Sequence, residues 1–167
     1  MASVSDATDR RVIGLLGVES ISELETFHDE YRANPGAMKA FEENGADCDR
    51  VRMEILQRLE LPVRPDGGPK YWARTLLVAK RGELPNLVAV MREVRGMAES
   101  VTFGLTRTIG GNADSVRVVF QLSSLNQLEA WNNELVSDKL QSYREKINAL
   151  TTQRTTELHR VEYSSQG

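Results

Sequence analysis

Residues 116–135, VRVVFQLSSLNQLEAWNNEL, contain the pattern that decides the fold of this chain. Apolar and polar residues alternate from Val116 to Leu122, which predicts a β-strand. Ser124 and Gln127 follow with the S-x-x-Q spacing of a helix capping box. Four apolar residues at helical spacing then predict a helix with one buried stripe: Leu125, Leu128, Trp131 and Leu135.

The surrounding sequence completes a β-α-β-β-α-β order over residues 71–163. Strands are predicted at 71–80 and 101–109, and a helix between them has Pro85 in its first turn and Gly96 at its end. After the helix that begins at Leu125, a second apolar stripe leads into a β-rich run at 155–163. Two successive βαβ units of this kind predict a ferredoxin-like α+β sandwich.

The N-terminal part repeats the devices of the C-terminal half. A short apolar run (12–18) predicts a strand, and Ser20 with Glu23 forms a second capping-box pattern. Helical stripes follow in the same register, and LQRLEL (56–61) aligns with LHRVEY (158–163). The shared register favours an internal duplication, so an additional β-α-α-β unit is predicted.

The Pro- and Gly-rich sequence LPVRPDGGPK (61–70) predicts a linker between these parts. We therefore expect five segments: a flexible N-terminus (1–10), the β-α-α-β unit (11–62), a linker (63–70), the ferredoxin-like domain (71–163) and a flexible tail (164–167).

The open face of the predicted sheet is expected to need a cover. Apolar residues point to both faces of the strand at 71–80, because Leu76 and Val78 alternate with Leu77 and Ala79. An apolar sheet face is unstable in water unless another layer packs on it. A second copy of the domain would form a dimeric barrel, so we expect a homodimer. The alternative is that the N-terminal unit covers the sheet of its own chain.

Short motifs in this stretch resemble those of NIPSNAP-like proteins. YWART (71–75) and KRGEL (80–84) match the Tyr-x-x-Arg-Thr and Lys-x-Gly-x-Leu pattern that opens the domain in that family. Further matches are Phe103-Gly104, Ser124-Leu125 and Trp131.

The resemblance covers residues 71–163 and implies the fold of the dimeric α+β barrel superfamily, with a homodimer. The chain departs from the pattern at Phe120-Gln121, where the third strand of that family often ends in a Trp. The superfamily includes haem-degrading enzymes, cofactor-free oxygenases, polyketide cyclases and non-catalytic proteins. The resemblance therefore implies a fold but no single chemistry.

Composition excludes several classes of function. The 167 residues are 40% hydrophobic and 27% charged, with a net charge of −3 and scattered basic residues, so neither nucleic acid nor a membrane surface is an expected partner. The first ten residues have no apolar run, so no secretory signal is expected. Cys48 is the single cysteine, which favours a reducing, cytoplasmic location.

His159 is the first candidate for a catalytic residue. It alternates with Glu157 in the last predicted strand, so the two side chains are expected on one face, where an imidazole can act as a general base. Gln57 occupies the corresponding position of the N-terminal copy. A hydrogen-bonded strand histidine without a catalytic role is the alternative.

Arg74 is the second catalytic candidate, because a guanidinium between Trp72 and Leu76 needs an anionic partner. That partner is either a ligand oxygen, with Arg107 contributing from a neighbouring strand, or Glu157 in a structural ion pair. Candidate ligand-binding residues are Tyr71, Trp72, Arg107 and Glu157.

No metal or cofactor is expected. Glu25 and His28 have the E-x-x-H spacing of di-iron bundles, but the second pair that such sites require is missing. With two histidines and one cysteine, the spacing of a zinc site is also missing.

Three functions stay open at this point. The first is a cofactor-independent oxygenase, cyclase or isomerase that acts on a small apolar or aromatic metabolite, with His159 and Arg74 in the site. The second is a non-catalytic barrel that binds a ligand or another protein. The third is a haem protein with His159 as the proximal ligand.

Overall fold

The chain consists of two compact units, with the boundary between Arg52 and Met53. The computed structural model describes residues 17–46, 54–109 and 112–161. None of the helices within these ranges is long and apolar enough to span a membrane.

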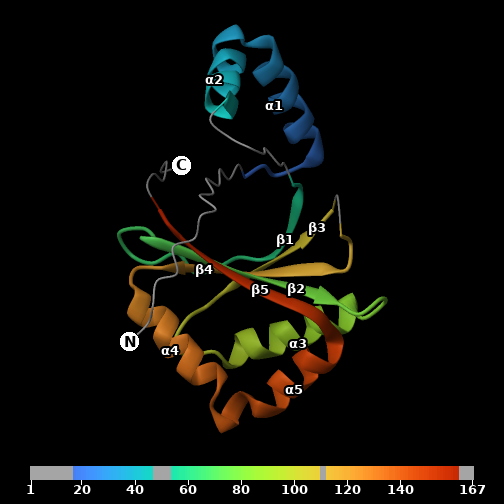
Figure 1. The fold of residues 1–167 in the computed structure, drawn as a ribbon, viewed down its shortest axis with the longest axis vertical. Helices are drawn as coiled ribbons and strands as arrows, with labels where there is room; N and C mark the ends of the chain where they lie inside the picture. Colours follow the sequence, from blue (N-terminus) through green and yellow to red (C-terminus); the bar gives the residue numbers. More distant parts are fainter. Residues whose placement is uncertain (1–16, 47–53, 110–111, 162–167) are drawn as a thin grey trace. The chain divides into compact units, whose positions relative to one another are not determined.

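The larger unit is a five-stranded antiparallel sheet with helices on one face (Figure 1). Its strand order is β1-β3-β4-β2-β5. Its elements are β1 (Leu56–Glu60), β2 (Tyr71–Ala79), α3 (Leu84–Met97), β3 (Gly104–Thr108), β4 (Ser115–Leu122), α4 (Leu125–Leu135), a 3-10 turn (Asp138–Leu140), α5 (Gln141–Leu150) and β5 (Thr151–Arg160). From β2 to β5 the order is that of a ferredoxin-like sandwich, so the predicted α+β fold class is confirmed.

The hydrophobic core lies between the helices and one face of this sheet. Alternate residues of β2 are buried there: Ala73, Thr75, Leu77 and Ala79. The predicted stripe of α3 faces them with Leu87, Met91 and Val94. Phe103, Phe120 and Trp131 form an aromatic cluster with ring centroids 5.5–5.6 Å apart.

The other face of the sheet carries no helix of this unit (Figure 1). Here Trp72, Arg74, Leu76 and Val78 of β2 are partly exposed. The strand register places Glu157 beside Arg74, on β5. We refer to this side as the open face.

Strand β1 departs from the predicted domain organisation. The sequence assigns it to the N-terminal unit 11–62, but it pairs with β3, with Leu56 opposite Thr108 and Gln57 opposite Arg107. Without β1, the backbone of β3 would form an unpaired sheet edge. The strand thus belongs to the larger unit, and the segment 11–62 is divided between the two units.

Strand β5 also begins earlier than the pattern predicts. It starts at Thr151, directly after α5, rather than at Thr155. The Lys80 backbone N–H donates to the Leu150 carbonyl at 2.8 Å, which holds the chain at this point. Arg154 consequently lies within the strand.

The smaller unit contains two helices, α1 (Ile21–Ala33) and α2 (Pro35–Ala46). They pack through the Tyr31 ring, which lies 5.9 Å from Phe27 and 6.4 Å from Phe41. Of the predicted strand 12–18, residues 12–16 lie outside the described part of the chain, and 17–18 are not in a strand. The internal repeat stays a prediction.

The two predicted capping boxes form different hydrogen bonds. Ser20 caps α1, and its hydroxyl accepts from the Glu23 N–H at 3.0 Å. Ser124 is the N-cap of α4 but makes no such side-chain bond. The Gln127 amide oxygen instead accepts from the Ser123 N–H at 2.8 Å.

Candidate functional site

Two of the predicted catalytic and ligand-binding residues form an ion pair on the open face. Arg74 Nε lies 2.8 Å and its Nη2 2.7 Å from Glu157 Oε2. Both side chains are about one quarter exposed (27% and 26%), so water screens the pair only in part. The guanidinium is therefore engaged by a carboxylate of the same sheet, as the structural alternative predicted.

His159 lies next to this pair but is not hydrogen-bonded to it. Its Nε2 is 3.5 Å from Glu157 Oε2, too long for a well-formed hydrogen bond. The Nε2 atom is buried and makes no hydrogen bond to any residue that the structure describes. Trp72 lies opposite His159 in the register of β2 and β5.

The structure separates Tyr71 and Arg107 from the residues of the open face. Tyr71 packs against the hydrophobic core on the helix side. Arg107 also lies on that side, where its Nε donates to Gln57 Oε1 at 2.5 Å. Strand β4 lies between β3 and β2, so Arg107 does not join Arg74.

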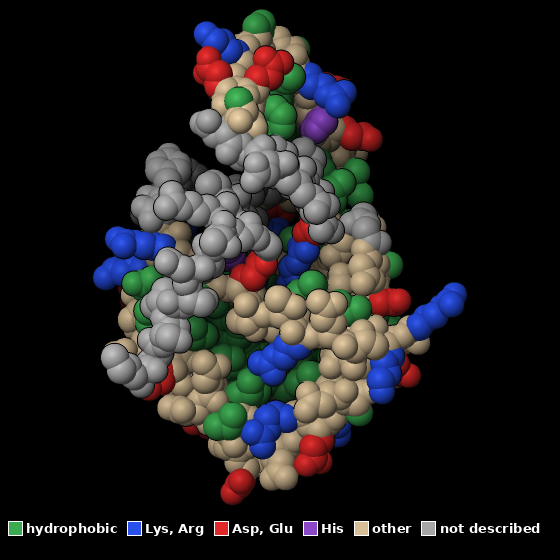
Figure 2. All heavy atoms as spheres, in the orientation of Figure 1, with side chains coloured by type: hydrophobic (Ala, Val, Ile, Leu, Met, Phe, Trp, Pro, Cys, Tyr) green, Lys and Arg blue, Asp and Glu red, His purple; other side chains and the backbone are tan. Residues whose placement is uncertain are grey.

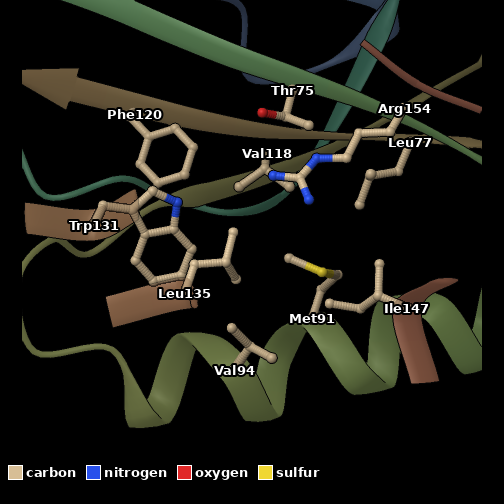
Figure 3. Close-up of a pocket in the computed structure, with 10 residues that line it drawn as sticks. All are labelled: Thr75, Leu77, Met91, Val94, Val118, Phe120, Trp131, Leu135, Ile147 and Arg154. Atoms are coloured by element: carbon tan, nitrogen blue, oxygen red, sulfur yellow. The ribbon is translucent and has the colours of Figure 1, made fainter. Parts of the chain in front are cut away.

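The described part of the larger unit contains an apolar pocket between the sheet and the helices (Figure 3). The cavity volume is about 30 Å³, which is room for about one water molecule. Its apolar lining comes from two strands and three helices: Leu77, Met91, Val94, Val118, Phe120, Trp131, Leu135 and Ile147. Apolar side chains are visible in a hollow on this side of the unit, beside basic ones (Figure 2).

Thr75 and Arg154 provide the polar groups of the pocket lining. The Thr75 hydroxyl lies 2.9 Å from that of Thr156. The Arg154 side chain extends from β5 into the pocket, over Val118 and toward Trp131 (Figure 3). Arg154 lies outside the β-rich run 155–163 that the sequence pattern predicts, so that pattern does not mark it as a strand residue.

Glu134 fixes the end of α4 beside the pocket residue Leu135. Its carboxylate accepts hydrogen bonds from Ser100 Oγ at 2.5 Å, the Ser100 N–H at 3.0 Å and the Glu99 N–H at 2.8 Å. Burial by itself would raise the pKa of Glu134, but the hydrogen bonds from Ser100 and Glu99 and the charge of Lys139 have the larger combined effect. The pKa of Glu134 therefore lies below its ordinary value.

The described residues contain no group of three or more His, Cys, Asp or Glu side chains placed to hold a metal ion. The pocket and His159 lie on opposite faces of the sheet. The chemistry available to the pocket is therefore that of a guanidinium, hydroxyls and aromatic rings.

Structures of similar fold were found among solved proteins. A NIPSNAP family protein from Agrobacterium tumefaciens has a TM-score of 0.50 and 16% identity, covering 56% of this chain and 95% of its own. A proposed monooxygenase from Lactobacillus acidophilus has a TM-score of 0.56 and 12% identity, covering 78% of this chain and 62% of its own.

A second proposed monooxygenase, from Fusobacterium nucleatum, has a TM-score of 0.52 and 8% identity, covering 86% of this chain and 71% of its own. The chain has the fold of these proteins. The resemblance to NIPSNAP-like proteins is thereby confirmed at the level of the fold. No protein-family model and no curated protein matches the sequence.

Proposed function

We propose that the larger unit is an α+β barrel domain that binds a small apolar or aromatic molecule in the pocket between its sheet and its helices. The observation that carries this proposal is the lining, in which eight apolar side chains surround a partly open cavity. Aromatic rings such as Trp131 and Phe120 offer large contact areas to a ring-shaped ligand.

A ligand must enlarge this pocket to enter it, because the cavity holds about one water molecule. Met91 can change shape easily, since its thioether side chain is flexible. Arg154 is exposed and Leu135 is partly exposed, so both can move toward solvent. The proposed site is thus a small, partly open pocket that widens when these side chains move.

A cofactor-independent oxygenase, cyclase or isomerase is the catalytic form of this proposal. Arg154 would stabilise an oxygen that becomes negatively charged during the reaction. A non-catalytic ligand-binding barrel is the second candidate, favoured because the described lining has no carboxylate, imidazole or thiol to act as a base. His159 does not line the pocket, so it does not support the alternative of a haem bound there through this histidine.

Two tryptophans make the binding proposal testable by fluorescence. Trp131 lines the pocket, whereas Trp72 lies on the open face. In Trp72→Phe the remaining Trp131 should respond saturably to 2-phenylethanol. In the matched Trp131→Phe variant, Trp72 should not respond. Unchanged Trp131 fluorescence would contradict the proposal, and so would an equal change in the fluorescence of both tryptophans.

Mass spectrometry of small molecules that co-purify with the chain tests for catalysis. Conversion of such a molecule by the protein, lost in Arg154→Gln, supports the enzyme. Stable retention without conversion supports the binding protein.

A homodimer and a cytoplasmic location are part of the same proposal. Leu76 and Val78 form a partly exposed apolar row on the open face, and a second copy would cover it. The single Cys48 favours a reducing compartment.

A further inference from the structure

Arg154 differs from the other arginines on the described strands in having no partner. Its side chain makes no hydrogen bond or ion pair with a residue that the structure describes, although its guanidinium extends into the pocket (Figure 3). The other strand arginines all have an interaction: Arg58, Arg74, Arg107, Arg117 and Arg160. Arg154 is exposed, so water solvates its charge in the free protein. Because its guanidinium lies beside an apolar lining and has no carboxylate bound to it, it can pair with an anionic group of a ligand that enters the pocket.

The hydroxyl of Thr75 adds a second polar group to the same wall of the pocket. Arg154 and Thr156 lie two residues apart on β5, so their side chains are on the same, helix side of the sheet. Thr75 lies opposite Thr156 on the adjacent strand β2, and its hydroxyl is on that side too. The Thr75–Thr156 contact uses the hydrogen of one hydroxyl. The hydrogen of the other hydroxyl remains available to a ligand oxygen.

The opposite side of the pocket is apolar. Trp131 and Phe120 lie across from the guanidinium, and Met91 lies beneath it (Figure 3). The pocket is therefore amphipathic, with one charged group at one end of a small apolar space. A planar guanidinium pairs well with a carboxylate because two N–H groups match two oxygens.

We infer that the ligand is a small monocarboxylate with an apolar body of about one aromatic ring, whose carboxylate is bound by Arg154. This inference rests on the proposed pocket and adds the charge of its ligand. The carboxylate would lie at Arg154 and Thr75, and the ring would lie against Trp131.

The test compares two probes with the same ring and chain length but different charge, phenylacetate and 2-phenylethanol. Binding is followed by Trp131 fluorescence in the Trp72→Phe background. Phenylacetate should bind on the order of tenfold more tightly or better, the range of a hydrogen-bonded charge pair. Arg154→Gln should abolish this preference while retaining 2-phenylethanol binding, and Arg154→Lys should retain part of it.

Arg81→Gln is the matched control, because it removes the same charge at an exposed turn before α3. It should leave the preference unchanged. Equal binding of phenylacetate to the wild-type and Arg154→Gln pockets would overturn the inference. Binding of 2-phenylethanol without any preference in the wild type would overturn it too, yet leave the pocket proposal standing. If neither probe changes the fluorescence, the pocket proposal and the carboxylate inference are both wrong.

Discussion

Gly104 gives the sharpest test of how β1 joins the sheet. A Cβ atom at this position would lie 2.5 Å from Pro62 Cδ, 2.7 Å from Pro62 N and 2.9 Å from the Glu60 carbonyl oxygen. Ordinary contacts lie at about 3.5–4.0 Å, so an alanine would overlap all three atoms. They belong to backbone and a proline ring, which cannot rotate away.

We expect Gly104→Ala to lower the free energy of unfolding by about 2–3 kcal/mol, toward the upper end of overpacking substitutions. For a unit of this size that corresponds to a fall in Tm on the order of 10 °C. The backbone of Gly104 does not require a glycine, since its φ is outside the left-handed region. The loss would therefore measure the steric contact of Gly104 with Glu60, the last residue of β1, and with Pro62 just after it.

Gly96→Ala is the matched control for this substitution. Gly96 lies near the end of α3 and is exposed, and a Cβ atom at this position would have no neighbour within 4 Å. Alanine should raise the stability there by about 0.5–1 kcal/mol. Denaturation by guanidinium chloride, followed through Trp131 fluorescence in the Trp72→Phe background, compares the two variants. The contact between β1 and β3 would be refuted if Gly104→Ala were as stable as the wild type.

Three further predictions concern the rest of the larger unit. Because the pKa of folded Glu134 is lowered, its carboxylate should stabilise the fold above the unfolded pKa, and this contribution should disappear as the pH falls through the folded value. Glu134→Gln should cost about 1–3 kcal/mol near pH 7 and flatten the acid limb of a stability–pH curve; an unchanged acid limb would contradict the assignment. Arg74→Met should cost about 1 kcal/mol or less, since the pair is partly exposed, and should leave the affinity for 2-phenylethanol unchanged because Arg74 lies outside the pocket; a weaker affinity would place it in the site. Leu76→Arg should convert the proposed dimer to a monomer in light scattering, whereas Arg81→Gln should not, and a wild-type monomer would rule out the dimer.

Local pattern predicts the elements from β2 to β5 well. The strand predicted at 71–80 is observed at Tyr71–Ala79, and the helix between Pro85 and Gly96 is observed at Leu84–Met97. These elements are specified by alternation, helical spacing and turn residues, all of which act within a few positions. The strand predicted at 101–109 is shorter, Gly104–Thr108. Arg95 Nε donates to the Phe103 carbonyl at 2.7 Å, so this carbonyl is bonded to a side chain just before the strand begins.

Pairing between distant segments could not be predicted in this way. LQRLE predicts a strand but does not indicate its partner. In the sheet it pairs with Thr108 and its neighbours, along the edge of β3 that β4 leaves free. The pocket could not be predicted for the same reason, because residues that lie far apart in the sequence line it. Thr75 and Trp131, for example, are too far apart for any local pattern to include both.

The partners of the strand arginines show why the sequence pointed to the open face first. Arg74 lies between two apolar residues, and that pattern correctly predicts a need for an anion. The register of β2 and β5 provides the anion within the chain, as Glu157. Arg154 lies among threonines and a glutamine, so its neighbours in sequence indicate an ordinary solvated residue. The residue is indeed exposed, but its position opposite Leu77 also places its side chain beside the apolar pocket, where no acidic side chain of the described residues pairs with it. A charged residue becomes a candidate for ligand binding through the partner it lacks in the folded sheet, and that property depends on the register.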